Sequence, residues 1–398
     1  MSFSQGGVTY TDVSGARGTS NVGSVAAIRD VQDSMITFKP YQTPILTKLM
    51  SEKARKKSSF NQTFEWMFSA LLPRTDTVTL AGGASSEDNI TVGDSTLYQV
   101  GTKFVVDATG EVLIVDSIAS SQIDVTKVGS GNITAGASVT IHFLNDSFEQ
   151  GSSSATAKSV NKERAYNYTE INKKAVHLTR SQKATAEYGG QDWDRNKLDR
   201  MEEFKFGLEM SLLKGIRSSG TGVQNGSFTQ YETGGMFDTT AAFIYNNYQY
   251  SGGTPSESWF FNTFLKGVFA KGTSKKRLYA GSNLVQAIND YSKVKTQTKV
   301  EASEYGVDIQ RIKCPFGMLE LVWHPLLDGT TFANQGVALD MGIDTIKYRY
   351  LAGNGENRDL NFEEFDYVKE TDARKGQWIG EIGWEIQGNE YHGLITQA

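Results

Sequence analysis

Residues 167–222 read NYTEINKKAVHLTRSQKATAEYGGQDWDRNKLDRMEEFKFGLEMSLLKGIRSSGTG, and this stretch decides the fold. Val176, Leu178 and Arg180 alternate with other residues, which predicts a strand with one buried face. A double glycine separates this strand from a long charged segment whose apolar residues recur at spacings of three and four. The stretch therefore predicts a strand followed by a long amphipathic helix.

The predicted helix is long, and no active-site residue is recognisable on it. Asp192 or Asp194 can cap its first turn, because a carboxylate accepts hydrogen bonds from the unpaired N–H groups there. About 25 residues at about 1.5 Å each give a rod of about 40 Å, which predicts a helix lying across a sheet. We expect its apolar stripe to be Leu198, Met201, Phe204, Leu208, Leu212 and Ile216, and its solvent-exposed side to carry Arg195, Asp199, Glu202, Glu203 and Glu209.

The charge of the chain is unevenly distributed. Residues 75–150 contain two lysines, no arginine and ten acids, a net charge of −8, whereas the whole chain carries −5. Within this block, residues 76–148 hold seven short strand-like segments separated by Gly, Asp, Asn and Ser, which predicts a small all-β sandwich or barrel. The low-complexity stretch 147–159 reads as a return linker. One acidic, strand-rich block is therefore inserted in a mildly basic chain.

The N-terminal part of the chain has the composition of an extended arm. Residues 1–34 are rich in Gly, Ser and Thr and poor in large apolar side chains, so we expect them to become ordered only against a partner. Pro44 prevents a continuous helix from crossing it. Ile45, Leu46 and Leu49 then fit a short helix.

A basic run and an aromatic strand follow this short helix. The run at 53–57 fits a solvated loop, and equally a contact with phosphates or with the acids of a neighbouring subunit. In the next segment, alternation places Phe64, Trp66 and Phe68 on one face of a strand. Because this segment leaves the main core, we expect another chain to cover that face.

The C-terminal half mixes helices with strands. Two helices are expected, with Ser256 and Ser282 as their caps, together with at least six strands that include residues 275–280 and 346–352. No repeat with a period of 20–50 residues is visible, which excludes a solenoid or a propeller. This half is therefore α/β or α+β, and the whole chain is expected to be α+β.

The sequence predicts no catalytic residue, no metal site and no cofactor. The four histidines are far apart, so each is expected to be a hydrogen-bonded strand residue rather than a metal ligand. Cys314 is the only cysteine, which excludes an intrachain disulfide and indicates maturation in a reducing cytoplasm. The glycine-rich stretches match no phosphate-binding pattern. No apolar run approaches the roughly 18–20 residues of a membrane span, so no membrane contact is expected.

The order of these segments resembles the major capsid proteins of tailed bacteriophages, in the subgroup with a strand-rich insertion. The likeness covers residues 25–237 in order. It is carried by TPILTKL (43–49), FEW (64–66), GTKFVVDATGEVLIVDSI (101–118) with IDVTKVGSG (123–131), the return stretch from FEQGSSS (148–154) to KATAEYG (183–189), LDRMEEFKFGLEMSLLKG (198–215) and TGGMFD (233–238).

The resemblance implies the tailed-phage major capsid protein fold, in which a long spine helix lies on a sheet beside an axial domain and an extended loop, here with an inserted all-β domain. The implied parts are an extended N-terminal arm (1–34), the extended loop with the start of the peripheral domain (35–75 and 149–185), the all-β insertion (76–148), the spine helix of the peripheral domain (186–221), a mainly axial domain (222–350) and the return strands of the peripheral domain (351–398).

The implied function is self-assembly of many copies into an icosahedral shell that encloses the phage DNA, with the virion as the final location and the host cytoplasm as the place of assembly. The implied partners are other copies in pentamers and hexamers, scaffolding, portal and decoration proteins, and packaged DNA at the inner face. DNA repels an acidic block, so residues 76–148 are expected to face outward. The candidates for contacts between subunits are Arg55, Lys56, Lys57, Glu65, Trp66 and Lys173.

Three other classes of protein fit parts of the sequence. Another virion component, such as a tail-tube or decoration protein, is the main alternative, although a tube subunit would need no long spine helix. A carbohydrate-binding adhesin built on the insertion would show glycan affinity in residues 76–148. An enzyme would need a polar constellation that the sequence lacks.

Overall fold

The computed structural model describes residues 2–5, 8–11, 43–52, 55–81, 87–185, 192–224, 226–295, 299–304, 307–329, 331–342, 345–365 and 372–398. It divides into two compact units. The main unit comprises Met1–Phe64 with Tyr166–Ala398, and the barrel unit comprises Glu65–Ala165. Most of the arm expected at residues 1–34 lies outside the described residues, where only the paired strands β1 (Ser2–Gln5) and β2 (Val8–Thr11) are described.

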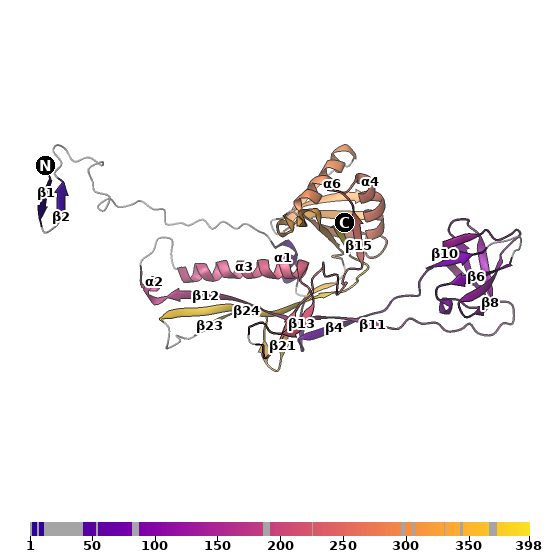
Figure 1. Ribbon diagram of the computed structural model, residues 1–398, viewed down its shortest axis with the longest axis horizontal. Coiled ribbons are helices and arrows are strands. Elements are labelled where there is room, and N and C mark those ends of the chain that lie inside the picture. Colours follow the sequence, from indigo (N-terminus) through magenta and orange to yellow (C-terminus); the bar gives the residue numbers. More distant parts are fainter. Residues whose placement is uncertain are drawn as a thin grey trace. The chain divides into compact units, whose positions relative to one another are not determined.

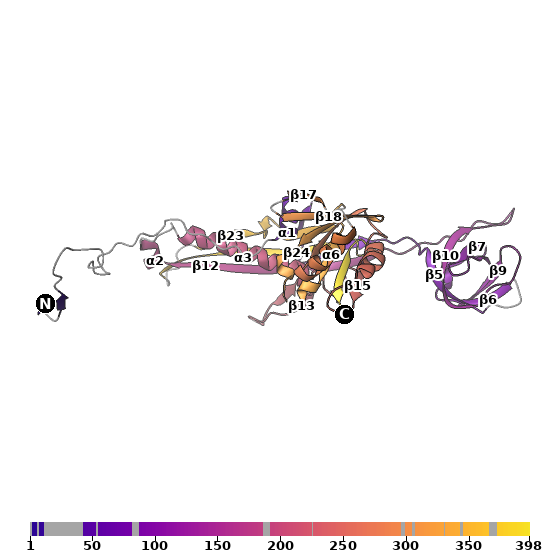
Figure 2. The same ribbon diagram turned by 90° about the horizontal axis from the view of Figure 1, so that it is seen from above.

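A long helix on a long sheet dominates one part of the main unit, as the sequence predicts (Figure 1). Helix α3 (Asp192–Lys214) lies along β12 (Glu170–Thr179) and β24 (Ala373–Ile386), and the second view shows the same arrangement (Figure 2). The sheet order is β12-β24-β21-β22, with β23 also paired to β24 and β3 to β21. The other strands of this sheet are β3 (Lys56–Ser59), β21 (Ile346–Gly353), β22 (Glu356–Asn357) and β23 (Asn361–Phe365).

The buried face of α3 differs from the expected stripe. Leu198 is 57% exposed, whereas Glu209, expected in solvent, is 0% exposed. Eleven residues are about three helical turns, so these two side chains leave the helix on the same side. The C-terminal half of α3 also packs against α1 (Pro44–Ser51), which covers that side only there. Ile216 is exposed because the helix has already ended, and the buried residues of α3 are Trp193, Phe204, Leu208, Glu209, Leu212 and Leu213.

A second, seven-stranded sheet completes the main unit and makes it α+β. Its order is β15-β25-β20-β16-β19-β18-β17, with strands β15 (Asn246–Tyr250), β16 (Lys275–Ala280), β17 (Lys299–Glu304), β18 (Val307–Cys314), β19 (Gly317–Trp323), β20 (Gly336–Leu339) and β25 (Gly393–Gln397). Helix α6 (Ser282–Lys295) packs near it, as does the continuous helix formed by α4 (Glu257–Trp259), the π-helical η4 (Phe260–Leu265) and α5 (Lys266–Val268). Phe260, Phe264 and Leu278 are central in the shared core.

Lys214 joins the end of α3 to the second sheet of the main unit. Its Nζ lies 3.6 Å from the ring centroid of Phe237 and 4.5 Å from that of Phe332, and it donates to Gln335 Oε1. Burial lowers the pKa of Lys214 to about 8. A cation also suits this position because the C-terminus of a helix carries partial negative charge.

The barrel unit is built on a closed six-stranded barrel, which decides between the two all-β forms expected for the insertion. The strand order is β10-β5-β6-β9-β8-β7, with strands β5 (Thr75–Leu80), β6 (Glu87–Val92), β7 (Thr102–Val106), β8 (Val112–Ala119), β9 (Gln122–Lys127) and β10 (Gly136–Asp146). Six of the seven expected strands are present; residues 131–135 form a loop instead, whose Ile133 is buried in the barrel core.

The remaining elements are short. Strands β4 (Thr63–Phe68) and β11 (Glu163–Tyr168) form a two-stranded ribbon, and the boundary between the two units falls within it. Strands β13 (Ser218–Thr221) and β14 (Thr229–Glu232) form a hairpin after α3. The other short helices are α2 (Arg180–Ala184), η3 (Ser95–Leu97), η5 (Pro325–Leu327) and η6 (Phe332–Asn334).

Candidate assembly surface

The most exposed large apolar side chains of the described residues fall in two places. Phe60, Met67 and Leu71, which are 87%, 74% and 92% exposed, lie in residues 60–74, here called the arm segment. Val223 and Phe228, which are 88% and 74% exposed, lie in the loop of the β13–β14 hairpin. Side chains of this size lose about 1.5–3 kcal/mol each by staying in water. Two separate surfaces of the chain are therefore suited to being covered.

The aromatic strand β4 alternates as its sequence predicts. Phe64 and Trp66 are buried on one side, while Glu65 and Met67 are exposed on the other. Glu65 Oε2 accepts a hydrogen bond of 3.2 Å from Arg164 Nη1 of the paired strand. The buried side is covered within the chain itself, so the surface left for a neighbour is the Glu65–Met67 side.

The basic run forms a strand rather than a solvated loop. Lys53 lies outside the described residues, and β3 pairs in parallel with β21. Arg55 is buried, donating through Nη2 to Met341 O at 2.8 Å and pairing with Glu52. Lys56 pairs with Asp359, and Lys57 is exposed. The structure thus places Arg55 and Lys56 against their own chain and leaves Lys57 open.

The predicted contact candidates do not form one cluster. Arg55, Lys56 and Lys57 belong to the β3 region, Glu65 and Trp66 to the ribbon, and Lys173 to β12, where it is exposed. Their role in contacts between subunits stays a prediction.

Glu209 is a buried carboxylate that joins three elements, and sequence reasoning missed it. Its Oε1 accepts from Ile45 N at 3.0 Å, and its Oε2 accepts from Leu46 N at 2.7 Å. These are two of the unpaired N–H groups in the first turn of α1, where negative charge is favoured. Oε1 also lies 2.8 Å from His324 Nε2, and both side chains are fully buried. Glu209 thereby fixes α1 and the end of β19 to α3. The burial of Leu208 and Leu212 beside it was the available sequence signal.

Asn167 fixes the loop after α3 in a similar way. Its Nδ2 donates to Gly234 O at 3.0 Å and to Trp384 O at 2.8 Å, and its Oδ1 accepts from Gly234 N at 2.9 Å. The residue is completely buried. All the hydrogen-bonding groups of this amide therefore serve to hold the loop that leads from α3 against β24.

A groove in the main unit lies between β12 and the β13–β14 hairpin. It has a volume of about 540 Å³. Strand β12 is at the edge of its sheet, and β14 lies near it without pairing to it. We call this space the hairpin groove; it is lined by Gln62, residues 169–173, 222–224 and 226, and 228–232.

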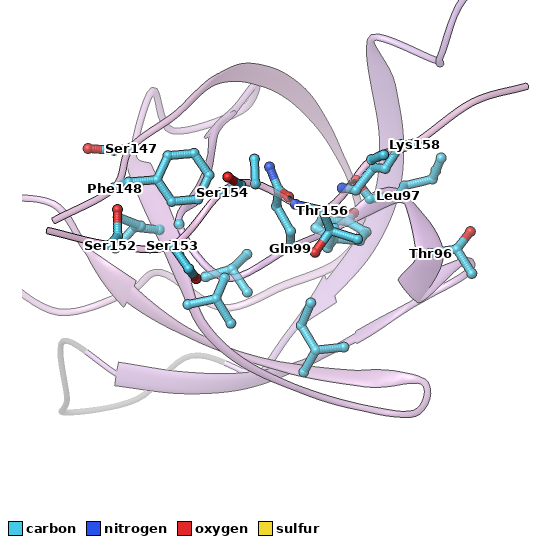
Figure 3. Close-up of a pocket in the computed structure, with 18 of the residues that line it drawn as sticks. Thr96, Leu97, Gln99, Ser147, Phe148, Ser152, Ser153, Ser154, Thr156 and Lys158 are labelled. Atoms are coloured by element: carbon cyan, nitrogen blue, oxygen red, sulfur yellow. Dashed lines mark hydrogen bonds between the residues drawn. The ribbon is translucent and has the colours of Figure 1, made fainter.

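A larger pocket lies within the barrel unit. Residues 147–159, here called the strap, were expected to be a linker, but they cover the outer face of the barrel near β8. Ser147 N donates to Gly101 O at 2.7 Å, and Lys158 Nζ donates to Leu97 O at 2.8 Å, so the strap is held at both ends. Figure 3 shows Phe148 at one end of this pocket, whose volume is about 1040 Å³, and Gln99 with Lys158 toward the other.

The described residues carry no recognisable catalytic or metal centre. No three His, Cys, Asp or Glu side chains among them are placed to hold a metal ion. His392 is fully buried, accepts from Asp340 N at Nδ1 and bonds Gln387 O through Nε2, which is the environment of a structural histidine. No helix in the described part of the chain is long and apolar enough to cross a membrane.

A long helix across a sheet, a second sheet domain, an inserted barrel and two exposed apolar surfaces define a structural protein that is completed by its neighbours. The model of the SU10 major capsid protein family matches residues 7–398, and the chain belongs to that family. It is a structural protein that forms the shell of a tailed phage, and its location is the virion.

Comparison with solved structures agrees with the predicted fold. The capsid of cyanophage A-1(L) has 9% sequence identity and a TM-score of 0.52, over 95% of this chain and 99% of that chain. The capsid of the Myoviridae phage XM1 has 10% identity and a TM-score of 0.45, over 97% and 100%. The capsid of a native GTA particle has 9% identity and a TM-score of 0.47, over 96% and 99%. No curated protein matches the sequence significantly.

Proposed function

We propose that each copy joins the shell by laying its arm segment on a neighbouring copy. The observation that carries this proposal is the exposure of Leu71 at 92%, together with that of Phe60 and Met67. Three such side chains are worth about 5–9 kcal/mol if fully covered, less the cost of association. Repeated over a closed shell, modest contacts of this size give a large total avidity.

The division of the chain into functional parts belongs to the same proposal. Residues 1–34 act as the N-terminal arm, and residues 35–75 with 149–185 as the extended loop and the start of the peripheral domain. Residues 76–148 form the insertion, 186–221 the spine region, 222–350 the mainly axial domain, and 351–398 the return strands. The exposed candidates Lys57, Glu65 and Lys173 would contact neighbours, while Arg55, Lys56 and Trp66 would support these surfaces from within the chain.

The proposed partners follow from enclosing a genome. Assembly takes place in the host cytoplasm, with scaffolding and portal proteins and with a decoration protein as a further partner. Packaged DNA touches the inner face without sequence preference. The net charge of −8 in residues 75–150 favours an outward barrel, since DNA repels acidic surfaces. Cryo-electron microscopy of the shell checks this orientation, and density for the barrel on the inner surface contradicts it.

The role of the arm segment is tested by electron microscopy and sedimentation velocity of purified protein. Leu71→Asp and Met67→Asp are expected to abolish closed shells while the subunit keeps its circular dichroism spectrum. Val128→Asp is the matched control, because Val128 is also exposed but lies outside the arm segment. Shells formed equally well by the Leu71 and Met67 variants would refute the proposal.

A further inference from the structure

The hairpin groove has an apolar rim. Val223 and Phe228 line it from the hairpin loop, and Ile171 lines it from β12. Ile171 is about half exposed, and the other two are among the most exposed large apolar side chains of the described residues. A groove with such a rim is unfavourable in water and fits an apolar occupant.

The groove also carries acidic groups. Glu170 and Glu232 line it, against one lysine, Lys173. Glu170 Oε2 is 3.4 Å from Thr233 N and from Ser211 Oγ, and burial, followed by the nearby Glu232, raises the pKa of Glu170. Glu232 is exposed and bonds only neutral partners in the printed contacts, Ser218 Oγ at 2.9 Å and Gln230 Nε2 at 3.2 Å. A cation entering the groove would therefore be favoured.

The edge of β12 offers a third feature. The strand pairs with β24 along its whole length and is the last strand in the sheet order, so no described strand pairs with its other edge. An unpaired edge beside a groove accepts an extended chain as an additional strand. The occupant that fits is thus extended, apolar and basic.

Residues 67–74 of this chain, MFSALLPR, have these three properties. Met67 and Leu71 are highly exposed, Arg74 is exposed, and the stretch contains no acid. Residues 69–73 belong to no helix or strand, so their backbone is available for pairing. Charge and hydrophobicity of this stretch complement those of the groove.

We propose that the hairpin groove receives residues 67–74 of a second copy of the chain. The inference rests on the proposed function and adds the receiving surface to it. Each copy then uses one surface to give and a different surface to receive, which is a heterologous contact. Contacts of this kind link copies head to tail and close into rings, as the pentamers and hexamers of a shell require.

A charge exchange tests the pairing of the two surfaces. Arg74→Glu and Glu232→Lys are each expected to reduce the yield of shells at least tenfold, because each places like charges together. The double variant, Arg74→Glu with Glu232→Lys, is expected to recover shells. Arg164→Glu, at an exposed arginine outside residues 67–74, combined with Glu232→Lys is the matched control and is expected to recover nothing. Equal recovery by the control pair would overturn the assignment.

Cross-linking distinguishes a second copy from the same copy. In a Cys314→Ser background, copies carrying Leu71→Cys are mixed with copies carrying Phe228→Cys, assembled and treated with a short bismaleimide. Covalent dimers containing one copy of each kind support the inference. Shells without such dimers overturn it and leave the groove to another protein. A double-cysteine variant that yields only an intrachain link also overturns it. Failure of the wild-type protein to form any shell refutes the proposed function itself.

Discussion

Glu209 is the residue on which most of the internal order of the main unit converges. A carboxylate with no exposure costs free energy unless its oxygens are bonded. Here they accept from two backbone N–H groups of α1 and lie against His324. The cost of burying the acid is therefore offset only while α1 and the end of β19 stay in place, which makes the three elements mutually dependent.

Glu209→Gln tests this dependence. The amide keeps one acceptor and turns its NH2 group toward a donor, so one buried N–H loses its partner, which costs about 1–3 kcal/mol. Urea unfolding of the unassembled subunit measures the loss. Faster amide exchange at Ile45 and Leu46 would show that α1 is the element released. Glu203→Gln, at a half-exposed acid that pairs with Arg200, is expected to change stability by less than about 0.5 kcal/mol.

His392 makes the stability of the subunit depend on pH. Burial lowers its pKa to about 4, against about 6.5 in an unfolded chain. Between these values the unfolded state binds more protons, so stability falls as the pH falls, by up to about 1.4 kcal/mol per pH unit. The expected result is that His392→Gln gains stability relative to wild type from pH 6.5 to pH 4, measured by urea unfolding. Above pH 7.5 their difference should be constant, and parallel curves throughout would contradict the prediction.

These residue-scale features mark the limit of sequence reasoning. Glu209 has the composition of a solvated position, and Asn167 lies beside a strand without any motif; their burial depends on which distant segments arrive there. His324 and His392 are hydrogen-bonded, as expected, but they lie in loops beside strands. A single sequence shows which groups can bond, whereas their partners are set by tertiary packing.

At the scale of the element, local patterns were sufficient. The helix expected after the double glycine is α3, the strand before it is β12, and six short alternating segments became the barrel. Each depends on periodicity within one segment. The expected face of α3 was wrong because that face changes along the helix: α1 covers one side of its C-terminal half only. A periodic stripe assumes one uniform neighbour, and α3 has two.

The two leucines of α3 that differ most from the expected stripe provide a direct test. Leu212→Ala removes a completely buried side chain and is expected to cost about 2–5 kcal/mol, since it leaves a cavity between α3 and its neighbours. Leu198→Ala, at an exposed position, should change stability by less than about 0.5 kcal/mol in the same thermal or urea unfolding experiment. Equal losses at the two positions would mean that Leu198 is buried.

At the scale of the whole molecule, the barrel is a separable insertion. Its core consists of residues between Val78 and Ile141, and none of them belongs to the core of the main unit. Strands β5 and β10 pair with Thr75 opposite His142, so the chain enters and leaves the barrel at neighbouring positions. Directly opposed residues in antiparallel strands are about 4.5–5.5 Å apart, which a two-residue turn can close.

Replacing residues 76–141 by Asn-Gly is therefore expected to leave the main unit folded and residues 67–74 in place. Thermal unfolding should lose the transition of the barrel and keep that of the main unit, because the removed residues contribute nothing to the main core. Electron microscopy should still show closed shells, since both surfaces of the proposed contact remain. A variant that stays folded but forms no shell would show that the barrel itself supplies an indispensable contact between copies.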